Sequence, residues 1–475
     1  MKLKSAKELA AVHSLELHGP NCEISGVQLS SRLCEPGDLF IAIRGEKHHG
    51  IDHLEDAISH GAVAVLTDPE HIPTIDIPVL IHPDPKSVAG SLAAAMYETD
   101  LSAMQLFAVT GTNGKTSTIT YLQQLLRSMG VPCGLSASTM RIVGEAEQTS
   151  SLTTPEVTEL HRMLAQMRQL GQLRAAIEVS AQAMIRHRVD GIHFDLVGFT
   201  NLSRDHLDDF GSMDEYLQAK AKLFTKTFAK RAVVMVEDEY SQKLVNLSEI
   251  PTVTISPEGD YSYGYSDDSL VITGKASLMV HAGVGGLMAK NLALALVMLL
   301  EAGFEPDQLQ TAVANTQLYV PGRLERVSPA APAVFVDYAH TPAGVGAAVK
   351  ELLGRYQELT VVLGASGNRD QGKREEMALS TKGATRLVIT DQHPRDEDPK
   401  DIRHALIQGA ASSFEAGRIF EIPEPDHAIR FAIEQTSNAG AVLWCGPGHL
   451  KYREVAGQKL PFDARAIARE AVEGD

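Results

Sequence analysis

The 475-residue sequence is poor in the patterns that mark extracellular, membrane-spanning or cysteine-metal proteins. It has four cysteines, Cys22, Cys34, Cys133 and Cys445, with no CxxC pair and no metal-ligand spacing, which indicates reduced and mostly buried thiols. The first residues, MKLKSAKELAAVHSLELHG, lack the apolar core of a signal peptide. No run of about 18 apolar residues occurs, so we expect no membrane span and a cytoplasmic protein.

Positive charge is also scarce. The chain has 43 Lys and Arg residues against 60 Asp and Glu residues, a formal net charge of −17. Such a chain repels nucleic acids and anionic membranes in general, so neither is an expected partner, and any polyanionic ligand needs a local basic pocket. A nucleotide is still compatible, because one loop and a metal ion can offset its charge. We expect a monomer or a weak dimer.

Strand and helix patterns alternate along most of the chain, which predicts an α/β fold. The length predicts about two to four domains. We predict three: a small N-terminal α/β domain (1–97), a central domain with a doubly wound, mostly parallel sheet and a phosphate loop (98–318), and a Rossmann-like C-terminal domain (319–475). The pair Pro321-Gly322 indicates a hinge before the last domain. Residues 251–285 read as a small antiparallel excursion within the central domain.

A glycine-rich turn follows the predicted strand LFAV and opens an amphipathic helix. The backbone N–H groups of such a turn, with the helix N-terminus, hold phosphate oxygens. Lys115 can reach the terminal phosphates and the Thr116 hydroxyl can ligate Mg²⁺. The strict GxxxxGK[ST] pattern has glycine where this chain has Val109, so the match is partial. The loop comprises Gly111, Thr112, Asn113, Gly114, Lys115, Thr116 and Ser117.

Acidic and basic side chains gather at the ends of later strands. Glu178 ends the strand AAIEV, where a carboxylate beside a triphosphate is a candidate Mg²⁺ ligand. The segment FTNLSRDHLDDF then brings His206 among several carboxylates, and Lys220 follows on a helix. Ligands of open α/β sheets bind beyond the carboxyl ends of the strands, so we expect these groups to share one site.

Motifs matched nearly end to end identify the sequence as similar to the Mur ligases, the ATP-dependent amide-forming enzymes of peptidoglycan precursor synthesis. The matching segments are SRLCEPGDLFIAIRG, TGTNGKTST, TTPE, EVSAQAM, FTNLSRDHLD, YLQAKAKLF, PGRLERV, VDYAHTP, GNRDQGKRE, PRDEDP and GPGH. The resemblance is strongest to the branch that adds the third residue to UDP-N-acetylmuramoyl-L-Ala-D-Glu, the MurE type. It implies roles in cell wall biogenesis, cell shape and cell division.

The resemblance implies an ATP site and a Mg²⁺ site. The catalytic set is Lys115, Glu178, His206, Lys220 and Arg323. Thr116, Glu178, His206 and Lys220 would hold Mg²⁺, with Lys220 carbamylated. CO₂ would turn its ammonium into a hard-oxygen ligand, whereas an unmodified cation would repel the metal. The residues implied to bind ATP beyond the phosphate loop are Asn291, Arg323, Asp337 and His340.

The resemblance also implies small-molecule substrates, a UDP-muramoyl-dipeptide or related acid and an amino acid. The matching positions are Leu29, Ser31, Thr153, Thr154, Ser180, Arg186, Arg188, Arg369, His393, Arg395, Gly446 and Leu450. Arg369 and Arg395 match positions that hold amino-acid carboxylates. His393 and Leu450 depart from the family pattern. Leu450 removes the glutamate that contacts the distal ammonium of diaminopimelate, and a buried ammonium without a partner is costly. The pattern therefore disfavours diaminopimelate and lysine and leaves a less charged amino acid open.

The resemblance implies that the substrate carboxylate takes the γ-phosphoryl group of ATP and that the amine of the amino acid then attacks the acyl phosphate. Three readings stay open. The first is the third-residue muramoyl-peptide ligase. The second is a paralogue that joins a different acid and amino acid in a specialised pathway. The third is a regulatory ATP-binding protein that does not ligate.

Overall fold

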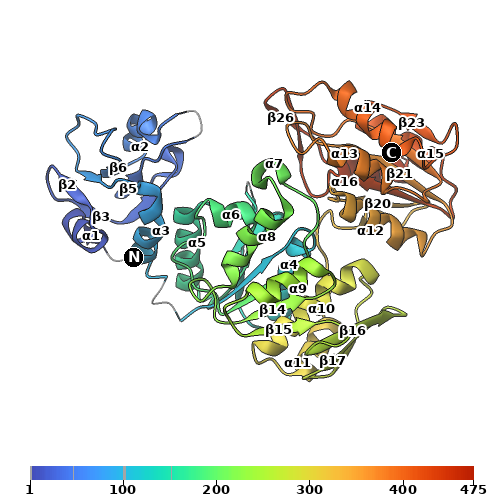
Figure 1. Cartoon of the computed structure of the whole chain (residues 1–475), viewed down its shortest axis with the longest axis horizontal. Helices are drawn as coiled ribbons and strands as arrows, with labels where there is room; N and C mark the ends of the chain where they lie inside the picture. The colour runs from blue at the N-terminus through green and yellow to red at the C-terminus, as the bar shows by residue number, and fades with distance from the viewer. Residues whose placement is uncertain (1–2, 46–47, 100–102, 151, 475) are drawn as a thin grey trace.

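The computed structural model describes residues 3–45, 48–99, 103–150 and 152–474. Figure 1 shows three α/β domains in chain order, with the central domain between the N-terminal and C-terminal ones. The predicted α/β class and three-domain organisation are confirmed. None of the helices that the structure describes combines the length and the apolar character needed to cross a membrane.

The N-terminal domain is built on a five-stranded sheet of order β2-β7-β6-β5-β4, parallel except for β2. Leu39, Ile41, Leu66 and Leu80 of the sheet pack with Leu92 of α3 in its core. Its elements are β1 (Lys4–Ser5), α1 (Ala6–His13), β2 (Glu16–His18), β3 (Glu23–Ile24), β4 (Gly26–Gln28), β5 (Asp38–Ile41), α2 (Leu54–Ser59), β6 (Ala64–Thr67), β7 (Val79–Ile81) and α3 (Pro85–Tyr97), with short 3-10 turns at Ser31–Leu33 and Gly50–His53.

The central domain is built on an eleven-stranded sheet of order β11-β10-β9-β12-β8-β13-β14-β15-β16-β17-β18. Strands β9 to β16 in that order are parallel neighbours, and antiparallel strands extend both ends. Its elements are β8 (Gln105–Thr110), α4 (Lys115–Ser128), β9 (Cys133–Ser136), β10 (Met140–Val143), β11 (Ala146–Thr149), α5 (Val157–Gln169), β12 (Arg174–Glu178), α6 (Ala181–Ile185), β13 (Leu196–Phe199), α7 (Leu207–Phe210), α8 (Met213–Ala221), a 3-10 turn (Lys222–Phe224), β14 (Ala232–Met235), α9 (Glu239–Leu247), β15 (Thr252–Ile255), β16 (Tyr261–Ser266), β17 (Ser269–Gly274), β18 (Leu278–His281), α10 (Gly286–Glu301) and α11 (Pro306–Ala314).

Helices cover both faces of this central sheet. Leu122 of α4 and Leu296 of α10 lie in the apolar cluster on one face, and Leu164 of α5 and Leu217 of α8 lie in the cluster on the other. Parallel strands buried on both faces are the expected consequence of strand–helix alternation. The antiparallel excursion predicted for 251–285 is present as β16, β17 and β18.

The C-terminal domain is built on a six-stranded sheet of order β19-β20-β24-β21-β22-β23, parallel except for β19. The helices α12, α13 and α14 contribute to the apolar cluster on one face, and α15 and α16 to the cluster on the other. Its elements are β19 (Glu325–Arg326), β20 (Ala333–Asp337), α12 (Pro342–Leu353), β21 (Leu359–Leu363), α13 (Lys373–Leu379), β22 (Arg386–Ile389), α14 (Pro399–Ala410), β23 (Ile419–Glu421), α15 (Pro425–Glu434), β24 (Ala441–Cys445), β25 (Tyr452–Val455), β26 (Gln458–Pro461) and α16 (Ala464–Glu473).

A buried ion pair joins the N-terminal domain to the central one. Arg162 of α5 donates from Nη2 to Asp38 Oδ2 at 2.6 Å and from Nε to the Tyr97 hydroxyl at 2.9 Å. Tyr97 in turn accepts a hydrogen bond from the backbone N–H of Val27. Because Asp38 is 2% exposed, removing its partner leaves a buried charge uncompensated.

We therefore expect Arg162→Met to lower the free energy of unfolding by about 3–5 kcal/mol, measured as a lower urea midpoint of the transition that releases the N-terminal domain. Arg127→Met removes the exposed ion pair with Glu145 and is the control, with an expected loss below about 1 kcal/mol. Equal losses in the two variants would show that the interdomain pair contributes no more than a surface contact.

Candidate active site

A cavity of about 690 Å³ lies between the central and C-terminal domains. This volume is in the range of pockets that enclose small-molecule ligands. The central domain contributes the turn after β8, the end of β12 and the loop after β13, and the C-terminal domain contributes segments that follow β20, β21, β22 and β24. The cavity therefore lies at the carboxyl ends of strands from two parallel sheets, where α/β proteins bind ligands.

Two glycines shape the turn after β8. Gly111 has φ +142°, and an added Cβ would lie 1.9 Å from Thr200 Oγ1. Gly114 has φ +86°, and an added Cβ would lie 2.2 Å from Asn291 Oδ1. Both positions therefore require glycine, for backbone conformation and for space. The helix α4 begins at Lys115, and its first turn leaves backbone N–H groups without helical carbonyl partners, which is an anion-binding arrangement.

Lys115 lies within this turn. Its Nζ donates to the carbonyl of Thr112 at 2.7 Å. Burial lowers the pKa of Lys115, while the carboxylates of Glu178 and Asp205 act in the opposite direction. The side chain thus places a cationic group at the loop that is suited to a phosphate.

A buried carboxylate and an arginine converge on the first helical turn. Glu178, which ends β12 and is 1% exposed, accepts from the Thr116 hydroxyl at 2.9 Å and from the Ser138 N–H at 2.8 Å. Arg323 of the C-terminal domain donates from Nη2 to Thr116 Oγ1 at 3.0 Å, and its guanidinium lies 4.4 Å from the centre of the Tyr338 ring. A carboxylate of the central domain and a guanidinium of the C-terminal domain therefore both contact the Thr116 hydroxyl. The carboxylate can hold a cation, and the guanidinium can hold an anion.

Lys220 lies beneath the turn on α8 and is 1% exposed. Its Nζ donates to the carbonyl of Gly111 at 2.7 Å and lies 4.3 Å from the centre of the Tyr216 ring. Burial, with the nearby Lys115 cation, lowers the pKa of Lys220 well below its usual value. This environment favours the neutral amine.

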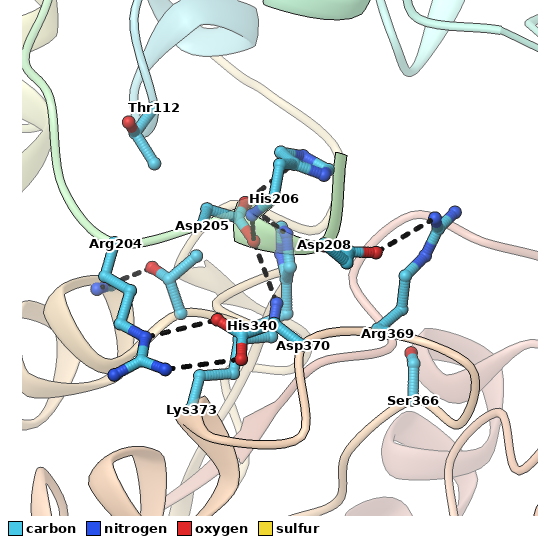
Figure 2. Close-up of polar contacts among 12 residues, drawn as sticks. Thr112, Arg204, Asp205, His206, Asp208, His340, Ser366, Arg369, Asp370 and Lys373 are labelled. Atoms are coloured by element: carbon cyan, nitrogen blue, oxygen red, sulfur yellow. Dashed lines mark hydrogen bonds and ion pairs between the residues drawn. The ribbon is translucent and has the colours of Figure 1, made fainter. Parts of the chain in front are cut away.

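Figure 2 shows Asp205 at the centre of a polar cluster that spans both domains. Its carboxylate contacts Lys373 Nζ at 2.9 Å, His206 Nε2 at 3.3 Å and His340 Nε2 at 3.4 Å. Burial acts to raise the pKa of Asp205, but the surrounding His340, His206 and Lys373 hold it well below its usual range. Burial lowers the pKa of His206 to about 4. Its imidazole is therefore neutral at physiological pH and able to act as a metal ligand.

The other residues predicted to bind ATP lie around the same turn. Asn291 of α10 packs against Gly114 and donates from Nδ2 to Met288 Sδ at 3.9 Å. Asp337 ends β20 and accepts from the backbone N–H groups of Ala339 and Leu324. Burial raises the pKa of Asp337, against the effect of the Arg323 cation. All four residues predicted to bind ATP beyond the loop line the cavity: Asn291, Arg323, Asp337 and His340.

The residues predicted to bind the acid substrate fall into two groups. Thr153, Ser180, Arg186 and Arg188 line the cavity. Thr154 is fully buried and donates to the carbonyl of Glu178 at 2.9 Å, which stabilises the end of β12. Leu29 and Ser31 follow β4 in the N-terminal domain and are not part of the cavity lining.

The residues predicted to bind the amino acid lie in the C-terminal domain and line that side of the cavity, here called its amino-acid end. They are Arg369, His393, Arg395, Gly446 and Leu450. The guanidinium of Arg369 lies 4.0 Å from Asp208 of the central domain.

One residue at this end was missed by sequence reasoning. Glu454 lies on β25, lines the cavity and accepts from Arg395 Nε at 3.2 Å. Its backbone N–H donates to His393 Nδ1 at 3.0 Å. Burial and the nearby Arg395 and Arg453 lower the pKa of His393 to about 4, so this imidazole is neutral. No sequence motif connects residues 395 and 454, because a folded hairpin brings them together.

A second histidine–carboxylate cluster lies in the N-terminal domain. Asp68 contacts His49 Nε2 at 2.9 Å and His71 Nδ1 at 2.8 Å, and the two rings stack with centroids 4.0 Å apart and planes 6° apart. A metal ion lies close to the plane of each imidazole that binds it, and two stacked parallel rings share no such plane. The observed arrangement is therefore a hydrogen-bonded cluster.

Comparison with known protein families matches three segments of the chain. Residues 23–97 match "Mur ligase family, catalytic domain", residues 109–297 match "Mur ligase middle domain", and residues 322–448 match "Mur ligase, glutamate ligase domain".

Curated proteins match over nearly the whole length. A "UDP-N-acetylmuramyl-tripeptide synthetase" of Leifsonia xyli subsp. xyli is 42% identical over 98% of this chain and 95% of that protein. A "UDP-N-acetylmuramoyl-L-alanyl-D-glutamate--2,6-diaminopimelate ligase" of Streptomyces coelicolor is 36% identical over 95% of this chain and 93% of that protein.

Solved structures agree with the fold. A structure of a UDP-N-acetylmuramoyl-L-alanyl-D-glutamate--2,6-diaminopimelate ligase superposes with a TM-score of 0.66 at 27% identity, covering 98% of both chains. MurF from Acinetobacter baumannii gives a TM-score of 0.72 at 17% identity over 100% of this chain and 99% of that one, a likeness of fold alone.

Proposed function

The chain belongs to the Mur ligase family and is an ATP-dependent acid–amino-acid ligase, and from this premise we propose that it adds the third residue to UDP-N-acetylmuramoyl-L-Ala-D-Glu in peptidoglycan precursor synthesis. The observation that carries the proposal is the meeting of Lys115, Thr116, Glu178 and Arg323 at one turn. A phosphate-binding turn with a carboxylate and a second-domain arginine is suited to phosphoryl transfer.

The proposal assigns one ligand to each domain. Residues 1–97 hold the uridine nucleotide, residues 98–318 hold ATP, and residues 319–475 hold the amino acid. The uridine end includes Leu29 and Ser31, and the muramoyl-peptide runs past Thr153, Thr154, Ser180, Arg186 and Arg188 into the cavity. The enzyme works in the cytoplasm, where ATP and UDP-linked precursors are available.

The reaction has two steps. First, an oxygen of the substrate carboxylate attacks the γ-phosphorus of ATP, and ADP leaves. Second, the neutral amine of the amino acid attacks the acyl carbon, the C–N bond forms, the C–O bond to phosphate breaks, and the nitrogen loses one proton as phosphate leaves. Both steps place negative charge on oxygen, so Lys115 and Arg323 act by fixed electrostatic stabilisation. Closure of the C-terminal domain excludes the water that would hydrolyse the acyl phosphate.

The residues at the turn fit Mg²⁺. Glu178 offers a buried carboxylate and Thr116 a hydroxyl, which are the hard oxygen ligands that this ion prefers, and the neutral imidazole of His206 faces the same cavity. When bound, Mg²⁺ supplies charge neutralisation and polarisation of phosphate oxygens. Thr116, Glu178, His206 and a carbamylated Lys220 would hold it.

The surroundings of Lys220 support carbamylation. The step joins the neutral Nζ amine to CO₂ and releases one proton, giving a carbamate anion. The contact of Nζ with the carbonyl of Gly111 places the new oxygens beside the phosphate turn. The carbamate replaces a neutral amine, which brings no charge to the site, with an anion that attracts both Lys115 and a metal ion.

The cavity wall supports a diamino acid with a single carboxylate as the second substrate. The pair with Glu454 offsets the charge of Arg395, so a second carboxylate such as that of diaminopimelate meets less net positive charge at this wall. The ion pair uses Oε2 of Glu454 and leaves Oε1 for another cation. Arg369 is placed to hold the α-carboxylate, and Glu454 the distal ammonium, with Leu450 and neutral His393 beside the aliphatic stem.

An ADP-release screen tests the function. With UDP-muramoyl-dipeptide present, we expect lysine, ornithine or diaminobutyrate to support release, and diaminopimelate and homoserine to support far less. Release that needs both substrates supports the proposed ligase. Release with an amino acid and a different acid supports a specialised paralogue, and release that ignores the amino acid contradicts ligation.

Glu454→Gln tests the recognition of the amine. Removing a hydrogen bond to a charged group costs about 1.5–3 kcal/mol, so we expect kcat/KM for the preferred diamino acid to fall by roughly 10- to 150-fold. Glu434→Gln, an exposed carboxylate on α15, is the matched control and should leave kcat/KM unchanged. Diaminopimelate as the preferred amino acid, or an unaffected Glu454→Gln variant, would show that the assignment of Glu454 is wrong.

A further inference from the structure

A forked ion pair links the central and C-terminal domains beside the cavity (Figure 2). Arg204, in the loop between β13 and α7, contacts Asp370 through Nε at 3.1 Å and Nη2 at 3.3 Å. Its remaining Nη1 donates to Glu376 of α13 at 2.7 Å. The Asp370 side chain is 10% exposed, so the fork is more shielded from solvent than an ordinary surface ion pair.

On the central-domain side, the loop that carries Arg204 is bound to the phosphate turn. The backbone N–H of Thr112 donates to Asn201 O at 2.9 Å, and that of Asn113 donates to Asn201 Oδ1 at 3.1 Å. The same loop ends at His206, the proposed metal ligand. These contacts hold the loop to the phosphate turn without the Arg204 side chain.

On the C-terminal side, Asp370 lies in the segment that carries two cavity cations. Asp370 Oδ1 accepts from the Gly372 N–H at 3.0 Å, which stabilises the turn between Arg369 and Lys373. Arg369 reaches across the domain boundary toward Asp208 at 4.0 Å, and Lys373 contacts Asp205 at 2.9 Å. The fork thus connects the turn that presents Arg369 to the loop that presents His206.

We propose that Arg204 is a positioning residue, whose forked ion pair with Asp370 closes the C-terminal domain and aligns the amino-acid end of the cavity with the phosphate turn. Arg204 itself is not among the residues that line the cavity. Its effect reaches the reaction through Arg369, so this part of the inference rests on the proposed amino-acid site. The effect on closure itself rests on the ion pair alone.

The shape of the fork explains why arginine is required. A planar guanidinium presents parallel N–H donors to both carboxylate oxygens and keeps a third donor for Glu376. A lysine ammonium at position 204 has no such plane, so Arg204→Lys keeps the charge and loses the alignment. Because the Arg204 side chain is 37% exposed, the ion pair also weakens as dissolved ions screen it, with a Debye length of about 8 Å at physiological ionic strength.

The kinetic test is a double-mutant cycle on the full chain. We expect Arg204→Gln and Asp370→Asn each to raise the KM for the amino acid about tenfold, and the double variant to do no worse than either single one. Arg204→Lys should recover only part of the loss. The KM for ATP should change by less than about threefold, because the phosphate turn is intact in each variant. Arg231→Gln, which removes a surface ion pair with Glu301, is the control.

Small-angle X-ray scattering tests closure without reference to the acid or the amino acid. With Mg²⁺ and a non-hydrolysable ATP analogue, we expect the wild type and Arg231→Gln to be more compact than Arg204→Gln and Asp370→Asn. A difference in scattering without any amino-acid-dependent turnover would refute the proposed function and keep the role in closure. Identical scattering of all four proteins, or additive losses in the double variant, would overturn the positioning role.

Discussion

We expect amino-acid-dependent ADP release to fall by at least about 10²–10³-fold in Lys115→Ala. Alanine removes the cation at the phosphate turn, where its Nζ lies 2.7 Å from the carbonyl of Thr112, and leaves the backbone of the turn in place. The loss appears mainly in kcat, because the charge on the transferring phosphoryl oxygens is greatest in the transition state. A coupled assay for ADP measures it.

Two controls separate lost chemistry from lost folding in that experiment. Lys226→Ala removes an exposed lysine of the same domain and should retain full turnover. The thermal midpoint of Lys115→Ala should stay close to that of the wild type, because the hydrogen bonds between the turn and Asn201 do not involve the lysine side chain. Near-normal turnover by a folded Lys115→Ala protein would contradict the proposed role of the turn.

Lys220→Ala is expected to lower turnover at least about 10²-fold, and short carboxylates such as acetate or formate should restore part of it. The truncated side chain leaves space on α8 beneath the turn, next to the carbonyl of Gly111, in which a free carboxylate can take the place of the carbamate. Turnover measured against carboxylate concentration should rise and saturate. Lys115→Ala should not respond, because it lacks a cation and not an anion.

A neighbouring position supplies the control for Lys220. Lys222 is exposed, so Lys222→Ala should retain activity and show no response to acetate. Carbon-13 labelled CO₂ gives a direct readout, since a carbamate resonance should appear in the wild type and not in Lys220→Ala. Absence of rescue together with an unmodified ammonium at Lys220 in electron density would refute the carbamate.

The sequence predicted the parts of the site that depend on local pattern. The phosphate turn lies between a buried strand and an amphipathic helix, and all three follow one another in the chain. Its place at the end of β8 could therefore be predicted from the sequence. Glu178 could be placed in the same way, because it ends β12, which neighbours β8 in the sheet. Parallel sheets bring such strand ends together whatever the domain arrangement.

The remainder depended on contacts between segments that lie far apart in the chain. Arg204 and Asp370 are 166 positions apart, and both are charged residue types that usually lie on a protein surface. Arg395 and Glu454 are 59 positions apart and meet at the β25 hairpin, where the Arg395 N–H donates to the Glu454 carbonyl at 3.1 Å. No periodicity marks such pairs, because an ion pair between distant segments needs two charges and a geometry that only the folded chain provides.

Oxygen-18 transfer tests the central claim most directly. The acid that supports amino-acid-dependent ADP release is prepared with oxygen-18 in the carboxylate, and the released phosphate is analysed by mass spectrometry. If that carboxylate receives the γ-phosphoryl group at the turn of Lys115, one phosphate is released for each amide formed, and that phosphate carries one oxygen-18 atom. Phosphate without label, or the absence of any acid that supports release, would contradict the account.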